Sequence, residues 1–258
     1  MFPTLIQLHP RRHQYPYGDG PFEVVPRTDA CRRIYGRGDH VLIGVSPGNS
    51  YFTSARVAEL SAWAVGRFAA VDIVYADLHV DAMFEACGYT PEHASKRANK
   101  EIKAVRRRIL RGLDEAQAPT GHVRVRALSE FADSPEYREL HGEVLHAMAT
   151  DREFQQACEQ MVRQVVVGRD EVGRDVAGRD EAGAEMSPAQ RRAGLDYIAA
   201  ELPFFLDTPG IVGVPTSVSC YHKLLPLTDV LYTRRSGLRA AGGQGYAVVR
   251  PQTVSAAA

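Results

Sequence analysis

A serine lies within the segment Gly44-Val-Ser46-Pro-Gly48, which has the Gly-x-Ser-x-Gly pattern of a serine nucleophile. A serine in this setting attacks an ester carbonyl, and the backbone N–H of the next residue normally stabilises the oxyanion that forms. The next residue here is Pro47, which has no N–H to donate. The motif therefore indicates acyl chemistry at Ser46 but weighs against an ordinary α/β-hydrolase. A simple turn serine is the alternative.

Two further pairs of polar residues have spacings suited to acid–base chemistry. Tyr197 and Glu201 lie four residues apart in a predicted helix and therefore point the same way. A phenol beside a carboxylate can hold a substrate ammonium group or relay protons, although such a pair can also be an ordinary helix surface. Tyr221 and His222 follow an apolar stretch, and neighbours in a strand face opposite sides, so only one of them can reach a shared pocket.

Three potential metal ligands, Asp77, His79 and Asp81, alternate along the chain. In an extended strand they would share one face, but zinc sites usually combine three or four ligands at other spacings. Helix-capping and turn roles are therefore favoured, and no metal site is predicted. The four cysteines are scattered and form no Cys-x-x-Cys pair, which favours buried thiols in a reducing cytoplasm.

The most charged segment is a predicted helix, in which residues 96–111 carry eight Lys or Arg and a single acid, Glu101, for a net charge of +7. When the sequence is projected at 100° per residue, Ala98, Val105 and Ile109 form an apolar face opposite most of these cations. Dense charge of one sign favours binding to a phosphate backbone over a merely solvated surface. Because no aromatic residues are interspersed, base-specific recognition is not indicated.

These candidate groups require a scaffold, and the sequence predicts a parallel sheet. An apolar run at 40–46 is typical of a strand buried on both faces, a helix is expected over 54–70, and a second apolar strand over 71–76. Strand, helix and strand in this order form a βαβ unit. Ser46 would then lie at the carboxyl end of the first strand, where open α/β sheets place their ligands.

The rest of the chain divides into one domain and two irregular parts. Residues 1–30 are rich in proline and are expected to form an irregular N-terminal arm, followed by a single domain over 31–258. Three copies of a Gly-Arg-Asp repeat predict an inserted surface loop at 168–186. The remaining expected elements are helices at 90–113, 133–148, 151–167 and 187–202 and strands at 123–128 and 246–249.

Composition sets outer limits on these interpretations. Hydrophobic residues make up 45% and charged residues 24% of the 258 residues, which excludes disorder as the main state. No apolar run approaches the ~20 residues of a membrane span, so a soluble cytoplasmic protein without membrane contact is expected. The 31 basic and 31 acidic residues cancel, which hides the local charge of the basic helix.

Taken together, the motifs resemble the cyclodipeptide synthases. The segments that carry the resemblance are 44–52 (Gly-Val-Ser-Pro-Gly-Asn-Ser-Tyr-Phe), 77–81 (Asp-Leu-His-Val-Asp), the basic helix, Tyr197-x-x-x-Glu201, 206–210 (Leu-Asp-Thr-Pro-Gly) and Tyr221-His222. The match runs from about residue 32 to 252, apart from the repeat. Asn49, Tyr221 and His222 match the subgroup named for those three residue types.

The resemblance implies a fold and an activity. The fold would be α/β, a Rossmann-like parallel sheet flanked by helices, similar to the catalytic domain of class I aminoacyl-tRNA synthetases. The activity would be synthesis of a cyclic dipeptide, a 2,5-diketopiperazine, from two aminoacyl-tRNAs, without ATP or any other cofactor. The enzyme would be a monomer, and downstream tailoring enzymes are possible partners.

Site roles also follow from the resemblance. Ser46 would carry the aminoacyl and dipeptidyl groups, Tyr197 and Glu201 would hold the ammonium group, and Tyr221 would relay a proton during ring closure. Asn49 would position the nucleophile, and His222 would be structural. The acceptor arm of a tRNA would dock on the basic helix through Lys100, Lys103, Arg107, Arg108 and Arg111.

The resemblance further implies two side-chain pockets. The first would be mostly apolar and accept a hydrophobic or aromatic side chain, with Ser219 leaving room for recognition of a hydroxyl group. Its lining would be Leu42, Gly44, Val74, Leu128, Phe204 and Ser219. The second would involve Met161, Gly168 and Arg169.

Two other functions remain open at this point. An α/β-hydrolase-type serine esterase would hydrolyse simple aryl esters without tRNA, and Pro47 weighs against it. A non-catalytic tRNA-binding module would keep its RNA affinity when Ser46 is removed.

Overall fold

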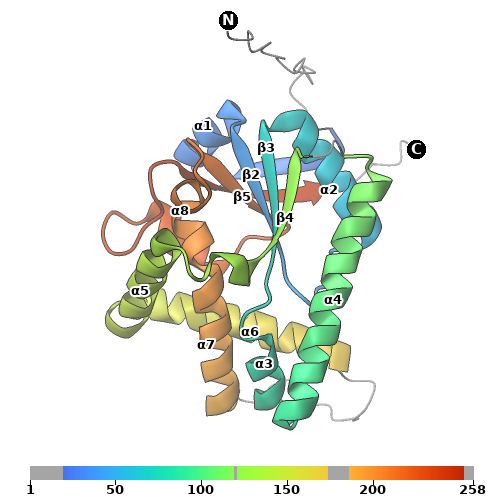
Figure 1. Ribbon diagram of the computed structural model, residues 1–258. Coiled ribbons are helices and arrows are strands. Elements are labelled where there is room, and N and C mark those ends of the chain that lie inside the picture. Colours follow the sequence, from blue (N-terminus) through green and yellow to red (C-terminus); the bar gives the residue numbers. More distant parts are fainter. Residues whose placement is uncertain (1–19, 119–120, 174–185, 253–258) are drawn as a thin grey trace, which may run out of the picture.

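The computed structural model describes residues 20–118, 121–173 and 186–252, with side chains omitted for 165–173. In this part of the chain, six strands form one sheet in the order β1-β6-β5-β2-β3-β4. Every pair is parallel except the antiparallel pair of β1 with β6, and helices cover both faces (Figure 1). The strands are β1 (Phe22–Pro26), β2 (His40–Val45), β3 (Ala70–Tyr75), β4 (Val123–Ala127), β5 (Ser217–Tyr221) and β6 (Gln244–Pro251). The predicted Rossmann-like α/β fold is confirmed.

Three long helices begin at a hydroxyl residue followed by proline, and all three had been predicted to within a few residues. The hydroxyl accepts the N–H of the residue three positions later, and the proline occupies a position whose N–H would be unsatisfied anyway. These helices are α4 (Pro91–Glu115), α5 (Pro135–Thr150) and α7 (Pro188–Glu201). The others are α1 (Asp29–Arg37), α2 (Ser54–Arg67), α3 (Val80–Ala86), α6 (Arg152–Gly173), α8 (Pro203–Val212) and α9 (Pro226–Thr233).

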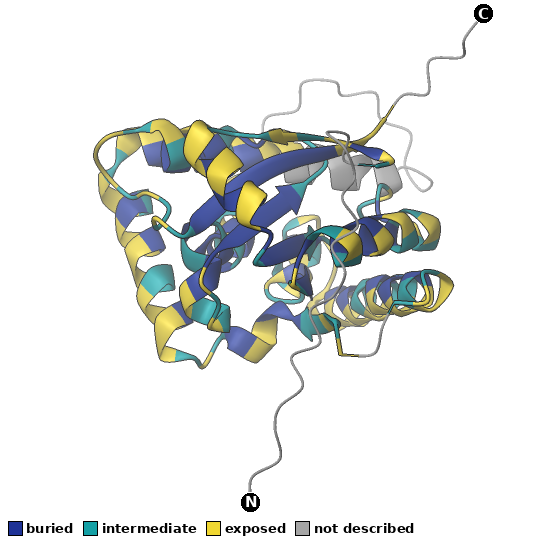
Figure 2. Cartoon of the chain, turned by 90° about the horizontal axis from the view of Figure 1, so that it is seen from above, coloured by how far each residue is buried: buried dark blue, intermediate teal, exposed yellow. Residues whose placement is uncertain are grey.

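Successive residues of β2 face opposite layers of the molecule. Ile43 packs in one core with Val57 of α2 and Ile109 of α4, whereas Leu42 packs in another with Phe204 of α8. The central strands β2, β3 and β5 are accordingly mostly buried, the edge strands β1 and β4 are partly exposed, and the outer surfaces of the helices are exposed (Figure 2). Alternation along a doubly covered strand therefore directs every second residue of β2 toward the α8 side of the sheet.

The N-terminal part differs from the prediction of an irregular arm over residues 1–30. β1 pairs with β6 along its length, Phe22 is fully buried against Trp63, and α1 already begins at Asp29. The prediction is wrong for residues 22–30 because an edge strand owes its structure to pairing with a distant segment. Residues 1–19 lie outside the described part.

The predicted loop at 168–186 is also wrong at its start. Helix α6 continues through the first Gly-Arg-Asp copy to Gly173. A glycine inside a helix costs only about 1 kcal/mol relative to alanine, and the residues around Gly168 are adequate helix formers. Residues 174–185, which hold the remaining copies, lie outside the described part.

A buried chain of polar side chains ties four strands together. His40 contacts the Ser217 hydroxyl through Nδ1 (2.7 Å) and an Asp72 carboxylate oxygen through Nε2 (3.1 Å), and Arg124 donates two hydrogen bonds to the same carboxylate (2.9 and 2.8 Å). The Ser-His-Asp order resembles a hydrolytic triad, but all three side chains are buried, so no substrate could reach them. The cluster is structural.

Asp72 should therefore matter for stability. Burial alone would raise the pKa of Asp72, but hydrogen bonds from His40 and Arg124 and the charge of Arg126 hold it below its ordinary value of 3.8. We expect Asp72→Asn to lower the free energy of unfolding by about 3 kcal/mol, the lower end for a broken buried ion pair, because both arginines are partly exposed. Denaturant titration measures the change.

A matched control is Asp229→Asn, which removes an exposed partner of Arg27 and should cost less than about 1 kcal/mol. Because the pKa of Asp72 is lowered in the folded protein, its ionised carboxylate contributes fully to the free energy of unfolding above pH 3.8, the ordinary pKa. This contribution is lost as the pH falls through the folded-state pKa. Equal losses in the two variants would contradict this role for Asp72.

Candidate active site

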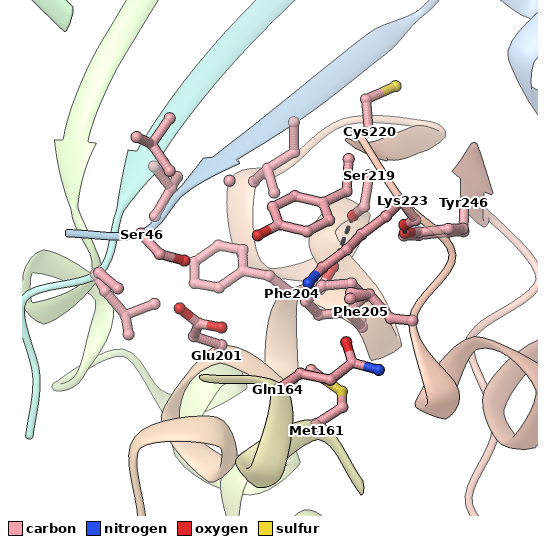
Figure 3. A pocket seen from close by; sticks show the side chains of 18 residues that line it. Ser46, Met161, Gln164, Glu201, Phe204, Phe205, Ser219, Cys220, Lys223 and Tyr246 are labelled. Carbon is pink, nitrogen blue, oxygen red and sulfur yellow. Dashed lines mark hydrogen bonds between the residues drawn. The ribbon is translucent and has the colours of Figure 1, made fainter. Parts of the chain in front are cut away.

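Ser46 follows the last residue of β2 at the carboxyl edge of the parallel strands, where the sequence predicted it. A cavity opens at this edge, and Ser46 lines it together with Glu201 from the end of α7 and Tyr221 from the end of β5 (Figure 3). These three polar residues come from distant parts of the sequence. The sheet topology brings them together, since β2 and β5 are direct neighbours.

The predicted lining of the first pocket is assembled in the same cavity. Alternate residues of β2 and β3, a 3-10 turn after β4 and helix α8 supply the apolar part of the wall. All the residues predicted for it line the cavity, and so does Met161 of the predicted second pocket: Leu42, Gly44, Val74, Leu128, Met161, Phe204 and Ser219. Gly168 and Arg169 of the predicted second pocket lie on α6, in the stretch 165–173 whose side chains are not described.

Asn49 connects the serine loop to Tyr221. Its Nδ2 donates to the phenol oxygen of Tyr221 (3.1 Å), while its Oδ1 accepts the backbone N–H of Tyr51 (3.0 Å). Its own backbone N–H is bonded to the carbonyl oxygen of Ser46 (3.3 Å). The carboxamide is therefore oriented at both ends, and this arrangement suits the positioning role expected of Asn49.

Tyr221 is a neutral phenol at this site. Its burial and the nearby carboxylate of Glu201 raise the pKa of Tyr221 well above the ordinary value of 10.0, and hydrogen bonds with Asn49 and Ser46 oppose this only in part. A phenol in this state keeps its proton at neutral pH. It can pass that proton on while taking another, beside the serine oxygen.

Tyr197 and Glu201 lie one turn apart on α7 but have different surroundings. Glu201 lines the cavity, whereas Tyr197, one turn earlier on α7, is 1% exposed and lies in the core cluster that includes residues of α6 and α7. Glu201 is therefore the member of this pair that lines the cavity, and Tyr197 belongs to the adjacent core.

His222 lies outside the cavity wall. Its ring stacks on Tyr51, with centroids 4.1 Å apart, and meets Phe52 edge-on at 5.8 Å. Burial, with the charges of Lys223 and Arg250, lowers the pKa of His222 to about 4, so the imidazole is neutral at physiological pH. These contacts support the structural role expected of it.

The hydroxyl group of Ser219 faces a backbone partner. It donates its proton to the carbonyl oxygen of Phe204 (3.1 Å) and accepts from Nε2 of Gln244 (3.0 Å), whose Oε1 accepts the N–H of Thr208 (2.9 Å). With its only proton used in this way, Ser219 offers no donor to a substrate hydroxyl. Its second lone pair remains available to accept a hydrogen bond from a substrate hydroxyl.

Sequence reasoning missed several lining residues. Lys223 extends its side chain into the cavity (Figure 3), and Gln164 and Tyr246 contribute polar groups to the wall. Gln164 lies three residues after Met161 on one helix face, a signal available from spacing. Tyr246 is paired in register with Ser219 across β5 and β6, which only the sheet order reveals. The others are Val45, Ala76, Phe205, Cys220 and Leu225.

The basic helix α4 presents most of its cations to solvent. Ala98, Val105 and Ile109 are buried as expected, and the exposed cations are Lys96, Lys100, Lys103, Arg106, Arg107 and Arg111. Arg108 differs from these because it is half-buried and donates from Nη1 to the carbonyl oxygens of Asn49 and Phe52 (3.3 Å each).

The two aspartates of the alternating set accept hydrogen bonds that stabilise the fold. Asp77 accepts hydrogen bonds from the backbone N–H (2.9 Å) and hydroxyl (2.6 Å) of Ser129, and Asp81 accepts the N–H of Ala82 (2.9 Å). Within the described ranges, no three His, Cys, Asp or Glu side chains are grouped as metal ligands would be. None of the helices described there is long and apolar enough to cross a bilayer.

Comparison with known proteins gives consistent matches over most of the chain. A family model for cyclodipeptide synthase matches residues 22–251. The chain is 42% identical over 230 residues to a cyclo(L-tyrosyl-L-tyrosyl) synthase of Mycobacterium tuberculosis, covering 89% of this chain and 76% of the relative. It is 43% identical over 230 residues to a cyclo(L-leucyl-L-phenylalanyl) synthase of Streptomyces noursei, covering 89% and 92%.

The fold has solved counterparts as well. A Mycobacterium tuberculosis structure, presented as demonstrating that cyclodipeptide synthetases are related to type I tRNA synthetases, matches with a TM-score of 0.77 at 40% identity. The match covers 90% of this chain and 94% of that one. The expected likeness of the fold to class I synthetases is thereby confirmed.

Proposed function

The chain belongs to the cyclodipeptide synthase family, and from that premise we propose that it forms a 2,5-diketopiperazine from two aminoacyl-tRNAs through intermediates on Ser46. The observation that supports this mechanism is the convergence of Ser46, Tyr221 and Glu201 on one cavity, with Asn49 hydrogen-bonded to Tyr221. An aminoacyl-tRNA is already an activated ester, so the reaction needs no nucleotide hydrolysis.

In the first step, Ser46 Oγ attacks the ester carbonyl of the first aminoacyl-tRNA. A new ester forms on Ser46, the bond to the terminal ribose breaks, and the proton of the serine passes to the departing ribose oxygen. The carboxylate of Glu201 faces the same cavity and holds the ammonium group of the bound residue. By accepting a proton from that group, it frees the amine for the next attack.

In the second step, the freed amine attacks the ester carbonyl of the second aminoacyl-tRNA. A peptide bond forms, the bond to the terminal ribose breaks, and a proton of the amine passes to the departing ribose oxygen as the tRNA leaves. The dipeptide is then attached to Ser46, and its new terminal amine attacks the Ser46 ester to close the six-membered ring. That amine loses a proton while Ser46 Oγ regains one. Tyr221, which is neutral and hydrogen-bonded to Ser46, relays the proton from the amine to the serine oxygen.

The pocket favours a bulky apolar first side chain. Its wall combines Leu42, Val74, Leu128 and Phe204, and the Ser219 hydroxyl is held by the backbone. A hydrophobic or aromatic residue buries its surface there without leaving a polar group unpaired. The two relatives compared above are named for tyrosyl, leucyl and phenylalanyl products, which are also bulky.

Expression in a bacterium followed by mass spectrometry of the medium tests the reaction and the specificity together. A diketopiperazine with a hydrophobic or aromatic first residue, lost on Ser46→Ala, is the expected result. Unchanged medium would contradict the proposal. Robust hydrolysis of simple aryl esters independent of tRNA would instead favour a serine esterase.

Tyr221→Phe removes the relay hydroxyl while keeping the ring. We expect product formation to fall by roughly 10²-fold, within the range for general acid–base groups. The first aminoacyl transfer should fall less, so the dipeptidyl-enzyme should accumulate and be detectable by intact-protein mass spectrometry.

Tyr246→Phe is the matched control, because the Tyr246 hydroxyl also lies at the cavity but donates to the carbonyl oxygen of Lys223 (2.6 Å). It should show no such accumulation. Equal behaviour of the two variants would argue against a relay at Tyr221.

A further inference from the structure

Arg108 stands apart from the other cations of α4. Its guanidinium is half-buried and its Nη1 lies 3.3 Å from both the Asn49 and the Phe52 carbonyl oxygens. Arg107 and Arg111, its neighbours on the same helix, are exposed. Arg108 thus bonds to a segment far away in the sequence, whereas Arg107 donates from Nε only to the Lys103 carbonyl oxygen of its own helix (3.5 Å) among the hydrogen bonds described.

One helical turn after Arg108, α4 packs against the start of α2. A Cβ atom at Gly112 would lie 2.7 Å from the carbonyl oxygen of Ser54 and 2.7 Å from Cβ of Val57, so only glycine permits this approach. Residues 108 and 112, one helical turn apart, share a side of α4. Together they place that side against the continuous segment from Asn49 to Val57.

The segment held by Arg108 contains the groups that surround the nucleophile. The Asn49 carbonyl oxygen accepts from Arg108, and the Asn49 side chain donates to Tyr221 (3.1 Å). The Asn49 N–H is bonded to the Ser46 carbonyl oxygen (3.3 Å). A shift of the Asn49 backbone would therefore reach Tyr221 and Ser46 directly.

We propose that Arg108 is a positioning residue for the loop over residues 46–52, which carries Ser46 and Asn49, rather than a contact for tRNA phosphate. The proposal rests on the function proposed above. Arginine suits the task because its guanidinium is always charged and forms strong hydrogen bonds with carbonyl oxygens. Helix α4 then has two surfaces with separate roles, an exposed one for phosphate and one that fixes the catalytic loop.

The variants Arg108→Met and Arg108→Lys, with Arg107→Met as the matched control, separate the two roles. Affinity for aminoacyl-tRNA and the single-turnover rate of transfer of a labelled aminoacyl group at saturating tRNA are measured for each. For Arg108→Met we expect the transfer rate to fall roughly 10- to 100-fold, as for small misplacements of reacting groups. The affinity of this variant for aminoacyl-tRNA should stay within about twofold of the wild type, a margin that allows for the loss of one positive charge near the tRNA.

Arg107→Met should give the reverse pattern, with weaker affinity and an unchanged saturating rate. Arg108→Lys keeps the charge but has a shorter side chain without the planar fork, so its transfer rate should remain low. A phosphate contact would instead be largely restored by lysine. Weaker affinity at an unchanged saturating rate in Arg108→Met would overturn the proposal.

A second readout is independent of activity. Hydrogen exchange at the backbone amides of residues 49–53 should be faster in Arg108→Met than in the wild type and unchanged in Arg107→Met. Unchanged exchange in both variants would overturn the proposal even if activity fell. If the wild type formed no labelled enzyme, the proposed function would fail, and the exchange result would still decide the role of Arg108 in holding the loop.

Discussion

Ser46→Ala is expected to abolish transfer of a radiolabelled aminoacyl group from tRNA to the protein. The substitution removes the oxygen on which the proposed ester forms, so we expect the rate to fall on the order of 10⁴-fold or more. Precipitation of the protein after incubation with labelled aminoacyl-tRNA measures the effect. Ser50→Ala, four residues later and exposed, is the matched control and should label like the wild type.

The same variant separates two of the functions considered from the sequence, the synthase and the non-catalytic RNA-binding module. A cyclodipeptide synthase loses labelling on Ser46→Ala while its affinity for tRNA stays within about twofold, since Ser46 lies at the sheet edge and carries no charge. A non-catalytic RNA-binding module would show no label even in the wild type. If the label still transferred to Ser46→Ala, the mechanism on this serine would be wrong.

The elements around Ser46 could be predicted because their signals are local. The apolar run of β2, the turn after it and the Thr90-Pro91 start of α4 each lie within a few residues, and all three appear where expected. β1 and α8 were missed for different reasons. β1 depends on pairing with β6, more than 200 residues away. Helix α8 begins at Pro203, directly after the helix predicted over 187–202, and a proline can mark either the end of one helix or the start of the next.

The site could be predicted in outline but not in its detailed contacts. Tyr197 and Glu201 share a helix side as their spacing indicates, yet only the packing of α7 shows that the cavity receives the carboxylate. Arg108 lies between the charged and apolar faces of its helix, so its sequence position fits either role. The Arg108 side chain reaches the Asn49 carbonyl oxygen because the end of β2 lies close to α4. A local sequence pattern cannot predict this tertiary contact.

The exposed face of α4 should control tRNA affinity without affecting chemistry. Arg107→Glu combined with Arg111→Glu replaces two exposed cations by anions, and phosphate repulsion should weaken aminoacyl-tRNA binding by about 10³-fold at low salt. The slope of log affinity against log salt should become shallower by about 1.5, as two phosphate contacts are lost. Fluorescence titration at several salt concentrations measures both quantities, and the single-turnover rate at saturating tRNA should not change.

The control for this double variant changes the net charge equally at other places. Arg32 on α1 and Arg192 on α7 have side chains that are 70% and 88% exposed, so Arg32→Glu with Arg192→Glu makes the same charge change away from α4. Because salt screens charges beyond about 10 Å, this pair should weaken binding only slightly at 0.1 M salt. Equal weakening by both pairs would mean that overall charge, not α4, governs binding, and unchanged affinity in the α4 pair would place the tRNA elsewhere.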